Sequence, residues 1–481
     1  MKKPIPALLY EQSEPGRRAA IMPECDVPES AFPEDLARDE LKLPELSEPG
    51  VVRYFTQISQ LNFSIDTNFY PLGSCTMKYN PKVNEAMAAL PGFVGHHPLQ
   101  EESLSQGSLE LMYRLQQQLA AVAGFHGVAL QPAAGAQGEF TGIMMIRAYH
   151  ESRGDTDRRK VLIPDSAHGT NPATVTMAGY EPVEIPSDEN GNVDLSAFEQ
   201  GCDETLAALM ITNPNTLGLF EEQIEEVTRL VHECGGLVYG DGANMNALLG
   251  TLRPGDVGID VMHFNLHKTF STPHGGGGPG AGPVAAAEVL TPFLPGPIVA
   301  RDEDGGPYYF ADPPQTIGRL KLFNGNFGML VRAFTYILMH GDSGIRELGE
   351  NAVLNANYLK SRIEKLLPVK FKRGCMHEFV ASGKIQGADD VHTMDIAKRL
   401  LDYGMHAPTV YFPLIVKEAL MIEPTESENK RTLDAFVEVL ETIINEARET
   451  PELLHNAPHE MPLRRLDEVK AVKDLVLCMR G

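Results

Sequence analysis

Asn-Leu-His-Lys-Thr-Phe at 265–270 places a lysine directly after the apolar segment Val-Met-His-Phe at 261–264, and a run of glycines follows at 275–278. The pattern predicts a buried strand that ends in a lysine-bearing loop. Desolvation disfavours the charged form of a lysine, so its amine becomes available as a nucleophile. Lys268 is therefore a candidate for a Schiff base, and the alternative is a surface lysine before a flexible loop. The glycines would let a planar ligand or a second chain approach the backbone closely.

An aspartate stands one strand-helix-strand step before this lysine. Gly-Gly-Leu-Val-Tyr-Gly at 235–240 predicts a buried strand that runs into Asp241. Ligands of open parallel sheets bind outside the carboxyl ends of the strands, so Asp241 and Lys268 can face one crevice. A carboxylate that keeps a pyridinium protonated beside a Schiff-base lysine is the pairing that pyridoxal phosphate requires. Taken alone, Asp241 could equally cap a helix.

A turn of small residues at 131–138 offers a phosphate site. The strand predicted at 127–130 leads into it, and a helix is predicted over 140–150. Free N–H groups at a helix start, together with the helix dipole, favour phosphate. We expect Ala136 and Gln137 to bind the cofactor there, although such turns are common without a ligand. The order of phosphate turn, aspartate and lysine is that expected of aspartate-aminotransferase-type pyridoxal enzymes.

Two further strand ends should reach the same edge of the sheet. His168 follows the strand predicted at 160–164, where its ring could stack on a cofactor or have a purely structural role. Asn213 and Thr216 follow the strand predicted at 207–211. Their polar groups are candidates for cofactor binding, and the alternative is that they only close a turn.

Composition excludes several classes of protein. The chain has 481 residues, of which 43% are hydrophobic, and a formal net charge of −24. That charge argues against nucleic acid and anionic membranes as partners. No uninterrupted apolar run is long enough to span a membrane, and the amino terminus does not read as a secretory signal. Six cysteines without a Cys-x-x-Cys pair fit neither a disulfide framework nor a zinc site, so we expect a cytoplasmic protein.

The distribution of apolar residues predicts three parts. Residues 1–75 read as an extended amino-terminal arm, and strand and helix patterns alternate in a large cofactor-binding α/β domain over 76–335. Residues 336–481 form a smaller α/β carboxy-terminal domain, whose predicted helix at 430–448 has an apolar stripe close to a 3.6-residue period.

Four motifs give the chain a specific resemblance. They are Pro-Leu-Gly-Ser-Cys-Thr-Met-Lys at 71–78, Ser-Ala-His-Gly-Thr-Asn-Pro-Ala at 166–173, the lysine motif at 265–270 with its glycine loop, and Met-Ile-Glu-Pro-Thr-Glu-Ser-Glu at 421–428. Over nearly its whole length the chain resembles the P-protein family of the glycine cleavage system. That family has a single-chain form of about twice this length with two homologous halves, so the chain resembles subunit 2 of the split, two-gene form.

The resemblance implies a fold, a cofactor and a reaction. The fold would be that of fold type I pyridoxal-phosphate-dependent transferases, with the cofactor covalently attached to Lys268, Asp241 at the ring nitrogen and His168 against the ring. Glycine would lose carbon dioxide, and its aminomethyl group would pass to the lipoyl group of H-protein. The implied partner is the homologous subunit 1, and the implied assembly contains two copies of each subunit.

Other functions stay open on the residues alone. A different fold type I lyase or aminotransferase, or a noncatalytic subunit that binds the cofactor, would carry the same lysine and aspartate. The phosphate ligands are also open, because the turn at 133–138 carries no hydroxyl. Cys75 lies in a motif loop, where it either approaches the sulfur chemistry or packs as a small residue.

Overall fold

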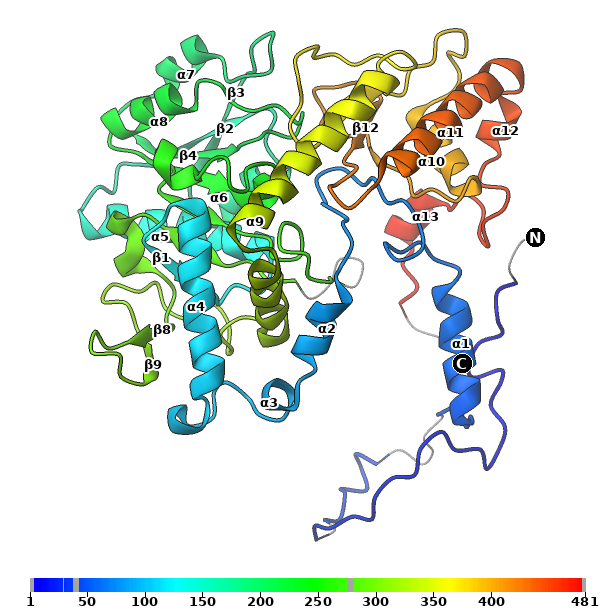
Figure 1. The fold of residues 1–481 in the computed structure, drawn as a ribbon, viewed down its shortest axis with the longest axis horizontal. Coiled ribbons are helices and arrows are strands. Elements are labelled where there is room, and N and C mark those ends of the chain that lie inside the picture. Colours follow the sequence, from blue (N-terminus) through cyan, green and yellow to red (C-terminus); the bar gives the residue numbers. More distant parts are fainter. Residues whose placement is uncertain (1–3, 29, 38–42, 275–279, 478–481) are drawn as a thin grey trace.

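The computed structural model describes residues 4–28, 30–37, 43–274 and 280–477 (Figure 1). Its centre is a sheet that has seven strands among these residues, in the order β1-β7-β6-β5-β4-β2-β3. The strands are β1 (Gly127–Ala129), β2 (Lys160–Pro164), β3 (Glu181–Ile185), β4 (Leu206–Thr212), β5 (Leu237–Asp241), β6 (Val261–His263) and β7 (Val284–Ala286).

Most of this sheet is parallel, as predicted. Strands β3, β2, β4, β5 and β6 pair parallel to their neighbours, whereas β7 runs antiparallel between β1 and β6. Of the seven described strands, only β7 departs from the parallel direction. The described residues between β6 and β7 form no helix, whereas a parallel partner needs a crossover that is usually helical.

Apolar residues on both faces of the sheet hold the domain together. All of β4 is buried, and its side chains divide by period two: Leu209 enters one hydrophobic cluster, whereas Ala208 and Met210 enter the other. Strands covered on both faces read as continuous apolar runs, which explains the strand signals in the sequence. The covering helices include α4 (Gln106–Ala123), α5 (Gly135–Ser152), α6 (Thr170–Met177), α7 (Leu195–Gly201) and α8 (Ile224–Glu233).

Short elements complete this domain. They are α2 (Lys82–Ala88), α3 (Pro91–Val94), η1 (Glu102–Leu104), η2 (Gly242–Ala247), η3 (Pro254–Val257), η4 (Glu288–Phe293), and the antiparallel pair β8 (Ile298–Arg301) and β9 (Tyr308–Ala311). The region from 307 to 328 thus contains β9.

One long helix joins the two lobes. Helix α9 (Phe327–Ile363) begins beside the large sheet and ends against the carboxy-terminal lobe, with a non-helical residue, Gly341, inside it (Figure 1). The boundary predicted at 335/336 falls within this helix. The second lobe has a hydrophobic cluster of its own. Its elements are β10 (Phe379–Ser382), α10 (Thr393–Asp402), β11 (Thr409–Val410), β12 (Ala419–Ile422), α11 (Lys430–Glu449) and α12 (Glu452–His455).

The first part of the amino-terminal arm extends away from both lobes (Figure 1), whereas its last residues pack on the second lobe, where Phe69 is buried and the N–H of Gly73 donates to the carbonyl of Met421. It is not entirely extended, because Ser47 caps a helix, α1 (Glu48–Ser59), that has a proline in its first turn. None of the side chains of α1 is buried, and Ile21 and Met22 in the arm are 95% and 81% exposed. The carboxy-terminal helix α13 (Glu468–Lys473) also has no buried residue. These two segments leave apolar side chains in solvent.

No helix among the described residues is both long and apolar enough to cross a bilayer.

A glycine holds the large domain against the second lobe. Gly218, in the loop after β4, has a φ of +76° and accepts a hydrogen bond from the N–H of Met376 at 2.7 Å. A Cβ atom at Gly218 would overlap the carbonyl carbon and oxygen of Glu378. Backbone therefore meets backbone at this junction, where only glycine fits.

We expect Gly218→Ala to destabilise the protein by about 4 kcal/mol or more, because the left-handed conformation and the backbone overlap add together. Gly404→Ala is the matched control, since Gly404 has a φ of +74° but no atom within 4 Å of the added Cβ. Its cost should be about 1 kcal/mol. Thermal unfolding of the two variants measures the difference, and equal midpoints would contradict the close approach.

Candidate active site

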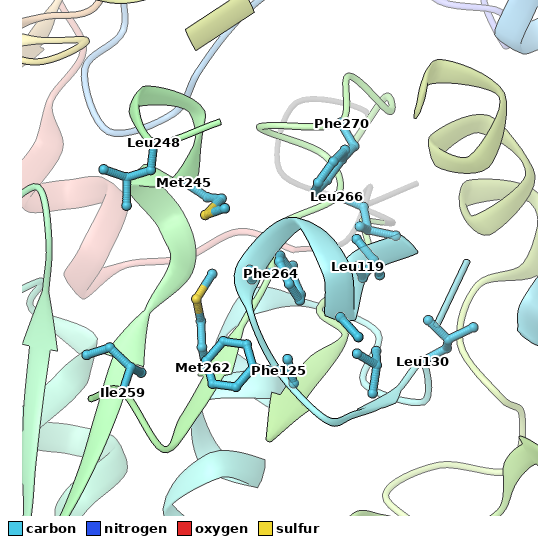
Figure 2. Close-up of a cluster of buried hydrophobic side chains, with 14 of the residues drawn as sticks. Leu119, Phe125, Leu130, Met245, Leu248, Ile259, Met262, Phe264, Leu266 and Phe270 are labelled. Carbon is cyan, nitrogen blue, oxygen red and sulfur yellow. The ribbon is translucent and has the colours of Figure 1, made fainter. Parts of the chain in front are cut away.

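Lys268 lies in a tight turn directly after β6. The N–H of Lys268 donates to the carbonyl of Asn265 at 3.0 Å, and its own carbonyl accepts from the N–H of Ser271 at 3.2 Å. The apolar neighbours Phe264, Leu266 and Phe270 are fully buried in the cluster that Figure 2 shows. Lys268 itself is half-buried. The hydrophobic core thus fixes the turn and leaves the lysine side chain outside it.

Asp241 ends the neighbouring strand and faces the same edge of the sheet. Its carboxylate is 6% exposed and accepts hydrogen bonds from the N–H of Ala243 at 2.9 Å and from Asn171 Nδ2 at 3.3 Å. The carboxylate does cap η2, as the alternative interpretation predicted. Capping and a site role coexist, because the two oxygens of a carboxylate offer about four acceptor positions.

A buried histidine supports this carboxylate. His263 Nε2 lies 3.6 Å from Asp241 Oδ1 and accepts from Asn265 Nδ2 at 3.1 Å, and its Nδ1 bonds the hydroxyl of Tyr239. Burial works to raise the pKa of Asp241. The charges of His263, His168 and Lys268, with the bond from Ala243, outweigh it and leave that pKa below its ordinary value. Asp241 is therefore an anion in a nearly dry site.

His168 meets Asp241 and Lys268 from a third strand end. Burial lowers the pKa of His168; the charge of Asp241 opposes this shift and that of Lys268 adds to it. The ring is thus neutral at neutral pH. Its Nδ1 lies 2.9 Å from Thr170 Oγ1, which donates to Glu139 Oε2 at 2.8 Å. The other ring edge contacts Phe412 of the second lobe, with centroids 5.9 Å apart.

The predicted phosphate turn forms the first turn of α5. The helix begins at Gly135, earlier than predicted, so Ala136 and Gln137 are helical. Ala134 at the N-cap makes no side-chain bond to the helix, which leaves first-turn N–H groups without an intrahelical acceptor. Ala136 is exposed, whereas the side-chain oxygen Oε1 of Gln137 accepts from the N–H of Ala133 at 2.7 Å. The turn presents backbone donors, and Gln137 braces it.

Asn213 and Thr216 make different bonds. Asn213 Oδ1 accepts from the N–H of Glu221 at 3.0 Å, which is a bond within its own loop. The buried Thr216 hydroxyl donates to the carbonyl of Ser166 at 2.7 Å and so ties its loop to the segment that carries His168. Their cofactor contacts stay predictions.

The second lobe adds three buried residues that the sequence interpretation missed. They are His377, Glu378 and Glu423, each fully buried, and each responds to the charge of Lys268. Glu423 stands in the motif at 421–428, which was quoted for its resemblance without a role. Nothing in sequence spacing connects it with His377, because only the fold of the second lobe brings them together.

Cys75 lies beside this group as a protonated thiol. Burial raises its pKa to about 11; the charge of Lys268 lowers it, and those of Glu423 and Glu378 raise it. A thiol nucleophile needs a depressed pKa, so this environment favours the packing role for Cys75. The glycine run at 275–278 lies outside the described residues.

Solved structures share the fold of this chain. Its sheet, together with the lysine turn and the uncapped helix start, defines a class of protein. An inhibitor-bound crystal structure of glycine decarboxylase (P-protein) of the glycine cleavage system superposes with a TM-score of 0.73 at 20% identity, covering 86% of this chain and 93% of that one. An apo cysteine desulfurase from Thermococcus onnurineus gives 0.58 at 16% identity, covering 79% and 95%. Residues 143–296 match the class-V aminotransferase family. The chain has the fold type I architecture of pyridoxal-phosphate-dependent transferases.

Sequence relatives identify the particular family. Residues 349–462 match the C-terminal domain of glycine dehydrogenase. Two full-length relatives, each named probable glycine dehydrogenase (decarboxylating) subunit 2, come from Alkaliphilus oremlandii and Thermotoga petrophila. The first is 54% identical over 99% of both chains, and the second is 55% identical over 98% of this chain and 100% of the relative. The chain belongs to the glycine dehydrogenase (decarboxylating) subunit 2 family.

The buried His377 predicts a specific acid sensitivity. Burial lowers its pKa from 6.5 to about 3, so between these values the unfolded chain binds a proton that the folded protein does not. The free energy of unfolding should therefore fall as pH falls through this window. His377→Gln should reduce that slope, measured by urea unfolding across the window. The exposed His392→Gln is the control, and an unchanged slope for His377→Gln would exclude the linkage.

Proposed function

We propose that the chain is the pyridoxal-phosphate-dependent subunit of a glycine decarboxylase, and that it releases carbon dioxide from glycine and passes the aminomethyl group to the lipoyl group of H-protein. The observation that carries the proposal is the convergence of Lys268 with an anionic Asp241 at adjacent strand ends. Family membership supports glycine as the substrate, since the relatives are named for that reaction.

The residues present fit the cofactor. The first turn of α5 offers backbone N–H donors for its phosphate, with Ala136 and Gln137 at that turn. Loop backbones approach this turn closely, because a Cβ on Gly138 would lie 2.6 Å from the carbonyl oxygen of Gly282. Because these glycines carry no side chain, none covers the backbone N–H donors of the first turn of α5. Lys268 would hold the cofactor covalently, and Asn213 and Thr216 would complete its surroundings.

Each site residue has a role in this scheme. When bound, pyridoxal phosphate supplies an electron-accepting ring. Asp241 holds a proton at the ring nitrogen, because its low pKa keeps the carboxylate charged while His263 and Ala243 fix its position. The neutral His168 would lie against the ring and exclude water from that face. Lys268 would provide the amine that holds the cofactor covalently.

The two other candidate functions predict different chemistry. An aminotransferase would return a proton to the substrate carbon and keep its carboxylate, whereas a noncatalytic subunit would bind the cofactor without turnover. The class-V aminotransferase match favours neither, because it reflects the shared fold. Carbon dioxide exchange into glycine is the property that only the proposed enzyme has.

The partner in this proposal is the homologous subunit 1, with two copies of each chain in the assembly. The relatives carry the designation subunit 2. The arm exposes large apolar side chains between residues 5 and 58, as does the carboxy-terminal segment around α13. In the arm these include Ile5, Leu8, Ile21, Met22, Val27, Phe32 and Leu36. Exposed apolar surface of this extent is typical of a segment that another chain covers.

The first test of the proposal is covalent labelling. Borohydride reduction of the purified protein followed by peptide mapping should place the cofactor on Lys268, since reduction traps a Schiff base at the lysine that forms it. Lys268→Ala should abolish the label and leave the circular dichroism spectrum unchanged. Lys321→Ala, in the same domain, is the control. A label on any lysine other than Lys268 would refute the assignment.

The second test is the exchange of labelled carbon dioxide into glycine, measured with lipoylated H-protein and with or without the homologous subunit. The chain alone should be poorly active, because one face of its site would come from the partner. Sedimentation of the same samples should show the two subunits in equal numbers. Full exchange activity in a homodimer of this chain would contradict the obligatory partner.

A further inference from the structure

The missed residues form one compact group at the junction of the two lobes. His377 and Glu378 stand directly before β10, and Glu423 follows β12. One ligand-type atom from each of the three lies within 4.8 Å of the others. His377 Nε2 is 3.9 Å from Glu378 Oε1 and 3.9 Å from Glu423 Oε1. Two carboxyl groups thus face each other and a histidine in a place without solvent.

The fold holds the outer oxygen of each carboxyl group. Glu378 Oε2 accepts from the N–H of Ser74 at 2.7 Å, and Glu423 Oε2 accepts from the N–H of Thr76 at 2.8 Å. Of the inner atoms, Glu378 Oε1 accepts one long hydrogen bond, from Asn244 Nδ2 at 3.4 Å. In the described part of the chain, Glu423 Oε1 and both ring nitrogens of His377 have no hydrogen-bond partner. Buried polar atoms without partners are costly, so this arrangement has room for a proton between the groups.

The charged groups around the pair come from three other segments. Lys268 lies after β6, the Cys75 thiol lies between the two backbone donors, and Glu426 follows Glu423 and forms an ion pair with Lys78 at 2.7 Å. Glu426 is thus neutralised by its own partner. Lys268 balances one negative charge of the pair, and the histidine cannot balance the second because burial keeps it neutral.

The ionisation of the pair agrees with this geometry. Burial raises the pKa of Glu423 to about 7. Burial, and after it the charge of Glu423, raises the pKa of Glu378 well above its ordinary value. Two facing carboxyl groups that interact strongly titrate as a unit and retain one proton over a wide pH range.

We propose that Glu378 and Glu423 share one proton and donate it to the sulfur that departs when the lipoyl disulfide opens. This role rests on the proposed function, whereas the shared proton rests on the structure alone. No single residue of the pair is the donor, because the proton belongs to both carboxyl groups.

The proton balance of the reaction requires such a store. The carbon–carbon bond of glycine breaks, carbon dioxide leaves, and the electron pair that remains forms a carbon–sulfur bond while the sulfur–sulfur bond breaks. The disulfide is reduced, and its second sulfur departs as a thiolate that takes the proton from the pair. The next glycine arrives as an ammonium ion and must lose one proton before its amine can react. That proton restores the pair, so each turnover begins and ends with one shared proton.

Infrared spectroscopy tests the shared proton without any need for turnover. The purified full-length protein should show the carbonyl stretch of a protonated carboxyl group, shifted in heavy water, that persists to about pH 7. Glu378→Gln and Glu423→Gln should each remove this band. Glu221→Gln is the matched control, because Glu221 is also buried, at 3% exposed, and accepts from the backbone N–H groups of Val193 and Gln223. It should leave the band in place.

Kinetics tests the role of the proton. In each of the two variants, the rate of aminomethyl transfer to lipoylated H-protein should fall about 100-fold or more, the range for a lost general acid. The absorbance of the attached cofactor and the apparent affinity for glycine should stay at wild-type values. In the wild type, the rate of aminomethyl transfer should change with pH near pH 7, and this change should be absent in both variants. A purely structural defect would lower the rate without removing its dependence on pH.

Four outcomes would overturn the proposal. They are the absence of the infrared band, its survival in either variant, transfer rates within about tenfold of the wild type, and a stoichiometric metal ion that both substitutions remove. A band that behaves as expected in a protein without glycine-dependent release of carbon dioxide would support the shared proton and overturn its role together with the proposed function. The two failures are therefore distinguishable.

Discussion

The parallel pairing of β5 with β6 is the constraint on which the site depends. Its register places Gly240 opposite Met262, so the strands end together and Asp241 comes beside His263. From there the two chains diverge, one into η2 and the other into the turn of Lys268. Ladder hydrogen bonds and the apolar cluster beneath them fix this divergence, because a shift by one residue would turn every buried side chain to the wrong face.

Desolvation gives the site its electrostatic character. Burial disfavours all charges there, and the result depends on which group has partners. Asp241 has a nearby histidine and two hydrogen bonds, so it stays anionic, whereas His168 becomes neutral. At the lobe junction the hydrogen bonds from Ser74, Thr76 and Asn244 do not outweigh the same burial, so the pKa values of Glu378 and Glu423 rise. One physical effect thus produces a fixed anion on one side of Lys268 and proton-holding groups on the other.

The second lobe is part of the site rather than an appendage. The backbone of the segment at 74–76 holds its residues Glu378 and Glu423, and Phe412 contacts the ring of His168. The close packing of Gly218 against Glu378 leaves little freedom between the lobes. A motif near the amino terminus, the lysine turn and the second lobe therefore meet although they are far apart in sequence.

The sequence by itself determined much of this protein. Continuous apolar runs predicted the strands, because both faces of the sheet are covered, and the residues after those runs were Asp241, His168 and Lys268. The tertiary structure decided what local patterns cannot express: the antiparallel β7, the helix α1 in the arm, and the earlier start of α5. It alone joined the lobes around His377, Glu378 and Glu423. Contacts across hundreds of residues depend on how two hydrophobic cores pack together, and a local pattern of residues holds no record of that packing.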